Sequence, residues 1–425
     1  MPHMSSELEK KFASNMNRLL STGDLCDVKG KVFVSALSGG PDSTSLAILA
    51  DQWIHANGGK LFTVTVDHAL RQESAEEAKT VGSWMKERNI DHRIIKWDHG
   101  AIPCGRKQVY ARQARYDLIF DFCSEVGADY LLVAHTLDDQ LETHLIRQES
   151  HSGDYGLAGM SASIKLPAGD VVLARPLLNV YKKELIEYLI AEGQKWVEDP
   201  SNLDQRYKRV RVRTALARNA DKAAIFRRIL ELGRARQELD RLVNNFIEGL
   251  VEVNRFGYAI FPADKFHELS HQMQRRTMKR LLWSLGGKQY PASDDRLIST
   301  IEQMQRLPAG KKINFSGCLL AKRKDCFHIM RELRGIDNAK TAQKAFWDRR
   351  FFVPSGNISG IMRAGLEKAA KLRDFYENDS MLVEGFGSIP VTKKDRRPLL
   401  LNAAESDMAV FRPLVNLTDE FVYLS

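Results

Sequence analysis

Residues 38–43 combine residue types that bind phosphate with one that repels it. The stretch reads Ser38-Gly39-Gly40-Pro41-Asp42-Ser43 and lies between two apolar runs. Glycines permit close approach of the backbone and a proline presets the first helical turn, so the loop should offer free N–H groups to an anion. The lysine of the P-loop pattern G-x-x-x-x-G-K-[ST] is missing here. Because a carboxylate beside phosphate needs a cation between them, Asp42 indicates Mg²⁺ shared with a polyphosphate that leaves as pyrophosphate. Taken alone, the loop also allows Asp42 and Ser43 merely to cap and stabilise the helix.

A second polar stretch, AHTLDDQLET at residues 134–143, places three carboxylates within about one helical turn. Thr136 is positioned to cap a helix whose first residues include Asp138, Asp139 and Glu142, and the i,i+3 and i,i+4 spacings let these carboxylates converge. Crowded carboxylates repel one another unless a cation lies among them. That cation is either Mg²⁺ or the ammonium of a substrate amine, whose proton a carboxylate could accept. The alternative is an acidic first turn that only complements the helix dipole.

The elements that must position these stretches alternate between strands and helices over residues 31–147. Such alternation is typical of an α/β fold with a doubly wound parallel sheet, in which ligands bind beyond the carboxyl ends of the strands. The stretches SGGPDS, VDHALR and AHTLDDQLET follow three of the strands and should therefore meet at one edge. The predicted strands are Lys31–Ala36, Lys60–Val66, Arg93–Lys96 and Tyr130–Ala134, and the predicted helices are Ser43–His55, Glu73–Arg88, Gln108–Val126 and Asp138–Arg147.

The rest of the chain divides by pattern into two further regions. We predict a catalytic domain over 1–218, a mainly helical domain over 219–340 and a small α+β domain over 341–425. A long helix over 220–250 and a helix over 293–306 show apolar residues at helical spacing. GKKINFSGCLLAKRKDCFHIM, at residues 310–330, has strand character and a Gly turn.

The charge balance favours a polyanionic partner. The chain carries 63 Lys and Arg against 54 Asp and Glu, a formal net charge of +9. One basic stretch, QRYKRVRVRTALAR, is predicted to contact RNA phosphates, which position an RNA without selecting a base. A solvated basic face is the alternative. The predicted contacts are Arg206, Lys208, Arg209, Arg211 and Arg213.

Several classes of protein are disfavoured. The five cysteines form no C-x-x-C pair, which argues against a disulfide framework, an iron-sulfur cluster or a structural zinc site. No apolar run approaches the roughly 18 residues of a membrane helix, and the first 15 residues are too charged for a signal peptide. We therefore expect a cytoplasmic protein without membrane contact.

Taken in order, the motifs resemble a known family. SGGPDS resembles the S-G-G-x-D-S signature of the PP-loop ATP pyrophosphatases, and AHTLDDQLET resembles the A-H-x-x-D-D-Q-x-E-T stretch of the tRNA(Ile)-lysidine synthetase family among them. VDHALR, ARQARY, GLAGM, RPLL and EDPSN follow in family order over about residues 30–215. Two departures stand out: Asp67 replaces an Asn, and Ser150-His151-Ser152-Gly153 replaces R-G-S-G, with Arg147 one turn earlier as a substitute charge.

The resemblance implies ATP-dependent ligation of free L-lysine to C2 of the wobble cytidine in tRNA(Ile) with a CAU anticodon, through an adenylated tRNA. AMP and pyrophosphate are released, and ATP and Mg²⁺ are required. It also implies residue roles: Asp139 with Glu142 holds and deprotonates lysine, Asp138 assists, and Arg112 and Arg115 bind anions. Asp42 and Asp139 are the predicted Mg²⁺ ligands. The predicted nucleotide contacts are Ser38, Gly39, Gly40, Pro41, Asp42, Ser43, His68 and His135.

Three other functions remain open. A tRNA thiolase of the same superfamily would need a nucleophilic or cluster-binding cysteine, for which Cys104 is the nearby candidate. A tRNA-binding protein that keeps ATP without turnover would bind tRNA and form no AMP. A small-molecule amide synthetase would leave the basic appended domains without a purpose. The sequence leaves the oligomeric state open, a homodimer included.

Overall fold

The computed structural model describes most of residues 6–336 and five short strands beyond them. The described ranges are 6–20, 28–68, 74–98, 107–165, 171–198, 208–219, 221–254, 256–288, 291–308, 310–336, 346–347, 351–352, 361–363, 390–392 and 410–411. The chain divides into two compact units, and the break falls between Gln237 and Glu238 within one long helix. Each unit is described by itself below.

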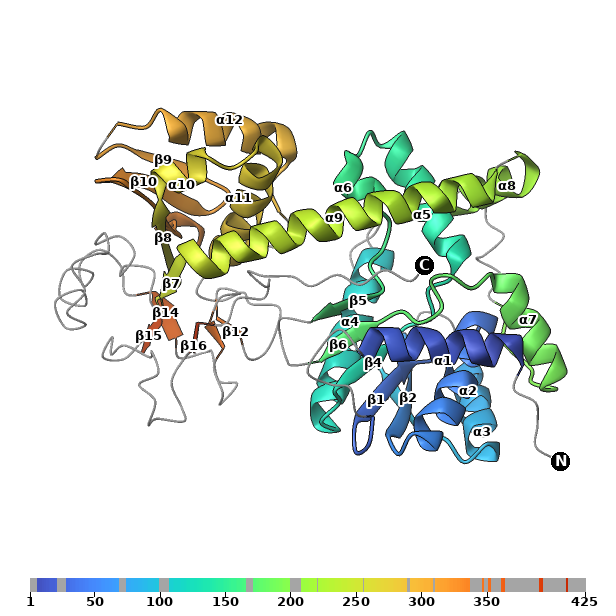
Figure 1. The fold of residues 1–425 in the computed structure, drawn as a ribbon. Helices are drawn as coiled ribbons and strands as arrows, with labels where there is room; N and C mark the ends of the chain where they lie inside the picture. The colour runs from blue at the N-terminus through green and yellow to red at the C-terminus, as the bar shows by residue number, and fades with distance from the viewer. Residues whose placement is uncertain are drawn as a thin grey trace. The chain divides into compact units, whose positions relative to one another are not determined.

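The first unit is built around a six-stranded sheet with the order β3-β2-β1-β4-β6-β5 (Figure 1). All neighbouring strands pair in parallel except β5 with β6. From β1 the chain adds β2 and β3 on one side of the sheet and β4 on the other, so the loops that follow β1 and β4 separate from each other. Sheets of this kind bind ligands at such a point. The strands are β1 Val32–Ala36, β2 Lys60–Asp67, β3 Asp91–Lys96, β4 Tyr130–Leu132, β5 Ser163–Lys165 and β6 Val172–Ala174.

Helices cover both faces of this sheet because successive strand residues point to opposite sides. Phe33 packs in a core with residues of α1, α2, α3 and α7, whereas its neighbour Val34 packs with residues of α4 on the other face. A smaller core joins α5, α8 and the start of α9. The helices are α1 Glu7–Leu20, α2 Pro41–Ala56, α3 Ser74–Glu87, α4 Lys107–Glu125, α5 Leu137–Glu149, α6 Asp154–Leu157, α7 Lys182–Ala191, α8 Lys208–Asn219 and α9 Lys222–Leu250.

The predicted doubly wound sheet is confirmed. Each of the four strands and four helices predicted over residues 31–147 is present, with ends that differ from the prediction by at most two residues. The long helix predicted over 220–250 corresponds to α9, Lys222–Leu250. Among the described residues, no helix is both long and apolar enough to cross a membrane.

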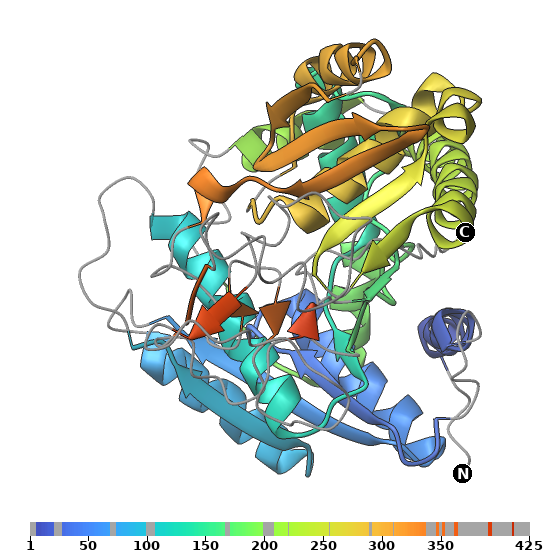
Figure 2. The same cartoon turned by 90° about the vertical axis from the view of Figure 1, so that its left-hand side faces the viewer.

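The second unit contains a five-stranded antiparallel sheet with the order β7-β8-β11-β10-β9 (Figure 2). Helices α11 and α12 pack against it, around a core that includes Phe261, Phe266 and Phe327. The sequence predicts strands in this region only over residues 310–330, so β7 and β8 were not predicted. The elements are β7 Glu252–Asn254, β8 Tyr258–Pro262, α10 Ala263–His267, α11 His271–Leu285, α12 Asp294–Gln305, β9 Lys312–Phe315, β10 Cys318–Arg323, β11 Cys326–Arg331 and the 3₁₀ turn η2 Leu333–Gly335.

The described part of residues 341–425 consists of five short strands. β12, β13 and β16 form one small sheet, and β14 pairs with β15 in an antiparallel ladder. They are β12 Phe346–Trp347, β13 Phe351–Phe352, β14 Ile361–Arg363, β15 Pro390–Thr392 and β16 Val410–Phe411.

Candidate active site

The loop after β1 has the backbone of a helix N-terminus open to an anion. Gly39 has a φ of +82°, and a Cβ there would lie 2.6 Å from Val81 Cγ2, so a side chain is excluded on two grounds. Gly40 is the N-cap residue and Pro41 is the first residue of α2. Ser43 Oγ accepts a hydrogen bond from the Ser38 N–H at 3.1 Å and donates one to the Gly40 carbonyl at 3.2 Å. Within the part of the chain that the structure describes, no side-chain hydrogen bond caps α2, so Asp42 and Ser43 do not cap it, although Asp42 in the first turn complements the helix dipole.

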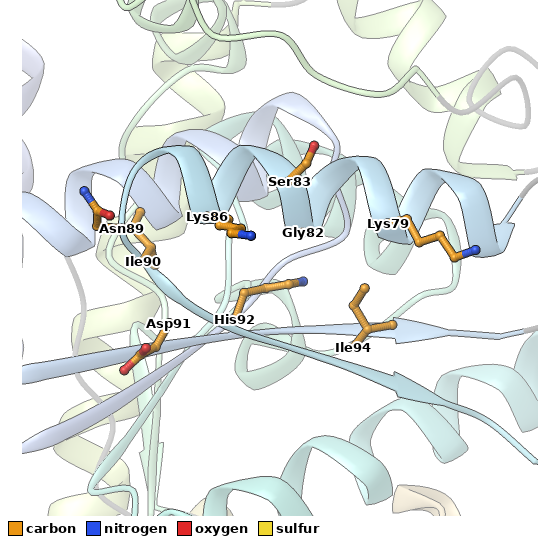
Figure 3. Close-up of a pocket in the computed structure, with 9 residues that line it drawn as sticks. All are labelled: Lys79, Gly82, Ser83, Lys86, Asn89, Ile90, Asp91, His92 and Ile94. Atoms are coloured by element: carbon orange, nitrogen blue, oxygen red, sulfur yellow. The ribbon is translucent and has the colours of Figure 1, made fainter.

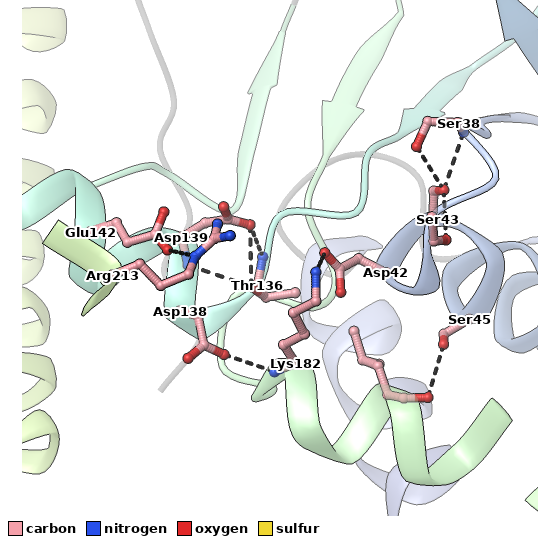
Figure 4. A network of polar contacts seen from close by, with 12 residues as sticks. Ser38, Asp42, Ser43, Ser45, Thr136, Asp138, Asp139, Glu142, Lys182 and Arg213 are labelled. Carbon is pink, nitrogen blue, oxygen red and sulfur yellow. Dashed lines mark hydrogen bonds and ion pairs between the residues drawn. The ribbon is translucent and has the colours of Figure 1, made fainter. Parts of the chain in front are cut away.

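Asp42 lies in the second position of α2 and pairs with a lysine from a distant helix. Its Oδ2 atom is 3.2 Å from Nζ of Lys182, the first residue of α7 (Figure 4). Its Oδ1 atom is buried and has no hydrogen-bond partner among the described residues. Burial raises the pKa of Asp42, the Lys182 ammonium opposes that rise, and the charge of Asp139 adds to it. Asp42, in the first turn of α2, and Asp139, in the first turn of α5, therefore lie within electrostatic range of each other.

The helix α5 begins with the capping arrangement that the sequence predicts. The Thr136 side chain accepts a hydrogen bond from the Asp139 N–H at 3.4 Å, and Asp139 Oδ2 accepts one from the Thr136 N–H at 2.9 Å. Asp138 turns toward α7, where its Oδ2 atom accepts a hydrogen bond from the Lys182 backbone N–H at 2.8 Å. Lys182 thus contacts both polar stretches, Asp42 through its side chain and Asp138 through its backbone (Figure 4).

Side chains of the protein itself neutralise the acidic cluster. Glu142 is 1% exposed, and its two oxygens accept hydrogen bonds at 2.7 Å from Nε of Arg209 and Nε of Arg213. Arg209 also donates to Asp139 Oδ1 at 2.8 Å. Arginines of α8 thus supply the positive charge among these carboxylates. The sequence had indicated only Mg²⁺ or a substrate ammonium as that cation.

The pKa of Arg213 responds to the charges of Glu142, Asp139 and Asp42. Burial by itself lowers the pKa of Arg213, but the hydrogen bond to Glu142 and the charges of Glu142, Asp139 and Asp42 raise it overall. One guanidinium therefore responds to carboxylates from the loop after β1 and from α5. These carboxylates share one electrostatic site in the first unit.

The other predicted basic contacts differ in position. Lys208 pairs with Glu149 at 3.1 Å, and Arg211 is exposed. Arg115 donates a hydrogen bond from Nε to His68 Nε2 at 3.0 Å, so two predicted ligand contacts meet beyond the carboxyl end of β2. Arg206 and the side chain of Arg112 lie outside the described residues, as does Cys104.

His135, in the segment between β4 and α5, is held by a buried arginine. Arg175 donates from Nε to His135 Nδ1 at 3.3 Å and from Nη1 to the Ser161 carbonyl at 2.8 Å. A histidine whose Nδ1 accepts a hydrogen bond is a neutral tautomer with its proton on Nε2. His135 can therefore act as a donor at that nitrogen.

The loop with the unusual Ser150-His151-Ser152-Gly153 sequence is anchored from α5. Arg147 donates from Nη1 to the Gly156 and Gly159 carbonyls at 2.6 and 3.0 Å. Gln140 bonds both the N–H and the carbonyl of Met160, and Gly159, at a φ of +69°, leaves room for it. Arg147 thus lies where it organises the GLAGM loop.

Three residues of the site had no role assigned to them from the sequence. Arg175 and Gln140 were seen only as letters of the RPLL and DDQ motifs, whose pattern does not say what each side chain touches. Lys182 had no signal at all, since nothing in the sequence separates it from Lys183. Only the packing of α7 beside α2 brings Lys182 to Asp42.

An open groove elsewhere in the unit shares no residue with this site. It runs between α3 and β3 (Figure 3) and is lined by Lys79, Gly82, Ser83, Lys86, Asn89, Ile90, Asp91, His92 and Ile94. Within the described ranges, no three His, Cys, Asp or Glu side chains form a cluster that could hold a metal by themselves.

Comparison with known proteins identifies the family of this chain. A family model described as a PP-loop domain matches residues 7–220. A tRNA(Ile)-lysidine synthase of Wolbachia pipientis is 31% identical over 376 residues, with 86% of each chain covered. The enzyme of the same name from Ruegeria pomeroyi is 33% identical over 341 residues, covering 78% of this chain and 80% of its own. That of Brucella anthropi is 40% identical over 217 residues, covering 49% and 47%. With similarity that extends across most of both chains and a PP-loop domain over the unit that holds the site, this chain belongs to the tRNA(Ile)-lysidine synthase family.

Proposed function

We propose that this chain ligates L-lysine to C2 of the wobble cytidine in tRNA(Ile) with a CAU anticodon, using ATP and releasing AMP and pyrophosphate. The observation that supports the proposal is that a candidate phosphate-binding loop and a candidate amine-binding carboxylate cluster lie in one site. A phosphate-type loop with Asp42 lies within electrostatic range of the α5 carboxylates, and Lys182 links them. The compartment follows from the substrates, because ATP and tRNA meet in the cytoplasm.

The first half of the reaction activates the base. The C2 oxygen of cytosine attacks the α-phosphorus of ATP, the bond to the β-phosphate oxygen breaks, and pyrophosphate leaves with the electron pair. The backbone N–H groups at the start of α2 and the hydroxyl groups of Ser38 and Ser43 bind the phosphates. Without this step the C2 oxygen is a very poor leaving group, whereas AMP is a good one.

Asp42 suits a magnesium site completed by ATP. Mg²⁺ is usually bound by one or two carboxylates together with substrate phosphates, and the buried Oδ1 of Asp42 lacks a partner among the described residues. When bound, the ion neutralises charge on the departing pyrophosphate. Asp139 is the weaker of the two candidate ligands, because its oxygens already bond Thr136 and Arg209.

The second half joins lysine to the activated carbon. The ε-amine attacks C2, loses a proton to a carboxylate, and AMP departs with the former C2 oxygen. Asp139 and Glu142 hold the incoming ammonium, which takes the place of a guanidinium on their oxygens. Arg209 and Arg213 are then available for the lysine carboxylate or RNA phosphate, together with Lys208 and Arg211.

The direct test is to incubate the purified protein with ATP, radiolabelled lysine and an unmodified tRNA(Ile) transcript. Label should enter the tRNA in a one-to-one ratio with AMP. Asp42→Asn should abolish AMP formation, whereas Glu142→Gln should raise the KM for lysine more than the KM for ATP. Glu149→Gln is the matched control, because Glu149 lies on the same helix but is exposed and pairs only with Lys208 among the contacts described.

Two outcomes would contradict the proposal. Binding of tRNA without labelled product or AMP would favour the protein that keeps ATP without turnover. An equal loss of lysine dependence in Asp42→Asn and Glu142→Gln would show that the division of roles between the two carboxylates is wrong.

A further inference from the structure

The loop over residues 38–43 lacks a basic residue, yet an ammonium group lies beside it. Lys182 Nζ is 3.2 Å from Asp42 Oδ2, and the two side chains are 36% and 25% exposed. The lysine reaches the loop from α7, which is 140 residues away along the chain. Position 182 therefore provides the kind of charge that a P-loop carries within its own sequence.

Hydrogen bonds at the start of α7 hold the backbone of Lys182 in place. Its N–H donates to Asp138 Oδ2 at 2.8 Å, and the preceding N–H, of Tyr181, donates to Glu184 Oε2 at 2.7 Å. One turn into α7, the Leu185 carbonyl accepts a hydrogen bond from Ser45 Oγ of α2 at 3.2 Å. These bonds tie the start of α7 to both α2 and α5 and fix the backbone from which the Lys182 side chain reaches Asp42 (Figure 4).

We propose that Lys182 binds the β- and γ-phosphates of ATP and so performs the task of the missing P-loop lysine. This inference rests on the proposed use of ATP by the same site. The Lys182–Asp42 ion pair is partly exposed to water, and such pairs contribute modestly to stability, so Lys182 can exchange Asp42 for phosphate oxygens. The exchange becomes favourable when the negative charge of the polyphosphate arrives and Asp42 gains another cation.

A purely structural role for Lys182 makes a different prediction. If the ion pair only joined α7 to the loop, its loss would affect every adenine nucleotide alike, because the whole pocket would deform. A contact with the β- and γ-phosphates must discriminate, since AMP lacks both. The ratio of ATP affinity to AMP affinity therefore separates the two roles.

The test measures binding of AMP and of α,β-methylene-ATP, which cannot be split between the α- and β-phosphates, by titration calorimetry with Mg²⁺ and without tRNA or lysine. We expect Lys182→Met to weaken binding of the triphosphate analogue by about 10- to 100-fold, the range for one charge-assisted hydrogen bond, and to change AMP binding by less than about 3-fold. Lys182→Arg should restore most of the affinity for the analogue.

Lys183 supplies the matched control. It is the next residue, its side chain is 86% exposed, and it pairs with Glu187 one turn along the same helix. Lys183→Met should leave both affinities unchanged. Circular dichroism and thermal unfolding of the full chain establish that each variant is folded.

An equal loss of affinity for AMP and the analogue in Lys182→Met would overturn the inference, and so would no loss for either. Failure of the proposed function is read from a separate experiment, the incorporation of lysine by the unmodified protein. If lysine is incorporated but Lys182→Met binds the analogue normally, only the assignment of Lys182 is wrong. If no lysine is incorporated but the selective loss is seen, Lys182 remains a phosphate ligand in a protein of another function.

Discussion

Replacing Arg209 and Arg213 together by methionine is expected to destabilise the first unit more than replacing Glu142 by glutamine. The reason is the unequal burial of the partners. Glu142 is 1% exposed, whereas the side chains of Arg209 and Arg213 are 42% and 44% exposed. Without Glu142 the guanidinium groups can turn to water and Asp139. Without both arginines the buried Glu142 carboxylate loses both of its countercharges and both hydrogen bonds of 2.7 Å.

The magnitudes follow from these environments. Leaving one buried charge uncompensated costs about 3–5 kcal/mol, so the double methionine variant should lose that much free energy of unfolding at pH 7. Methionine retains the apolar stem of arginine, which limits the loss of packing. Glu142→Gln should cost about 1–2 kcal/mol, the value of hydrogen bonds to half-hydrated groups. Combining all three substitutions should return the loss toward that smaller value, because the buried charge of Glu142 is then absent.

Urea unfolding followed by tryptophan fluorescence measures these differences. The two units can unfold separately, so the transitions are fitted individually and their slopes compared between variants. Lys208→Met is the control, because its pair with Glu149 lies on the same two helices but is exposed on both sides, and it should change stability by less than about 0.5 kcal/mol. A double methionine variant no less stable than Glu142→Gln, or one that Glu142→Gln fails to rescue, would refute the reasoning.

Two further predictions concern stability elsewhere. Burial lowers the pKa of His92 from its ordinary 6.5 to about 4. Between pH 6.5 and 4, His92 is therefore protonated in the unfolded chain and neutral in the folded chain. The free energy of unfolding should fall as the pH drops through this range. His92→Asn should reduce this loss by about 1 kcal/mol at pH 5, measured by urea unfolding at pH 5 and 7.5; an unchanged pH dependence would contradict it. In the second unit, Asp240→Asn should cost about 3–5 kcal/mol, because the buried Arg280 loses its carboxylate, and a thermal transition unchanged by this substitution would contradict that estimate.

The sequence alone predicted four of the six strands of the first sheet, β1 to β4, and the loops that follow them; β5, β6 and the strand order came from the structure. Alternating apolar runs predicted β1 to β4 and α2 to α5 because periods of 2 and 3.6 residues are local properties. Gly39, Gly40 and Pro41 predicted a helix N-terminus, since the conformation of such a turn depends on those residues themselves. Thr136 forms the predicted cap for the same reason, and Asp139 adds a reciprocal hydrogen bond that was not predicted. The order of the motifs also indicated the family.

Only the tertiary structure decided which charges meet. Arg209 and Arg213 looked like part of an exposed basic strip, and nothing in their spacing indicated Glu142, 67 and 71 residues away. Lys182 and Lys183 are the same residue type at adjacent positions in the sequence. Because α7 packs on α2, the Lys182 side chain contacts Asp42, whereas that of Lys183 is exposed to solvent. Contacts between distant segments depend on how whole helices pack, and charge attraction acts through space without any period along the chain that a sequence could reveal.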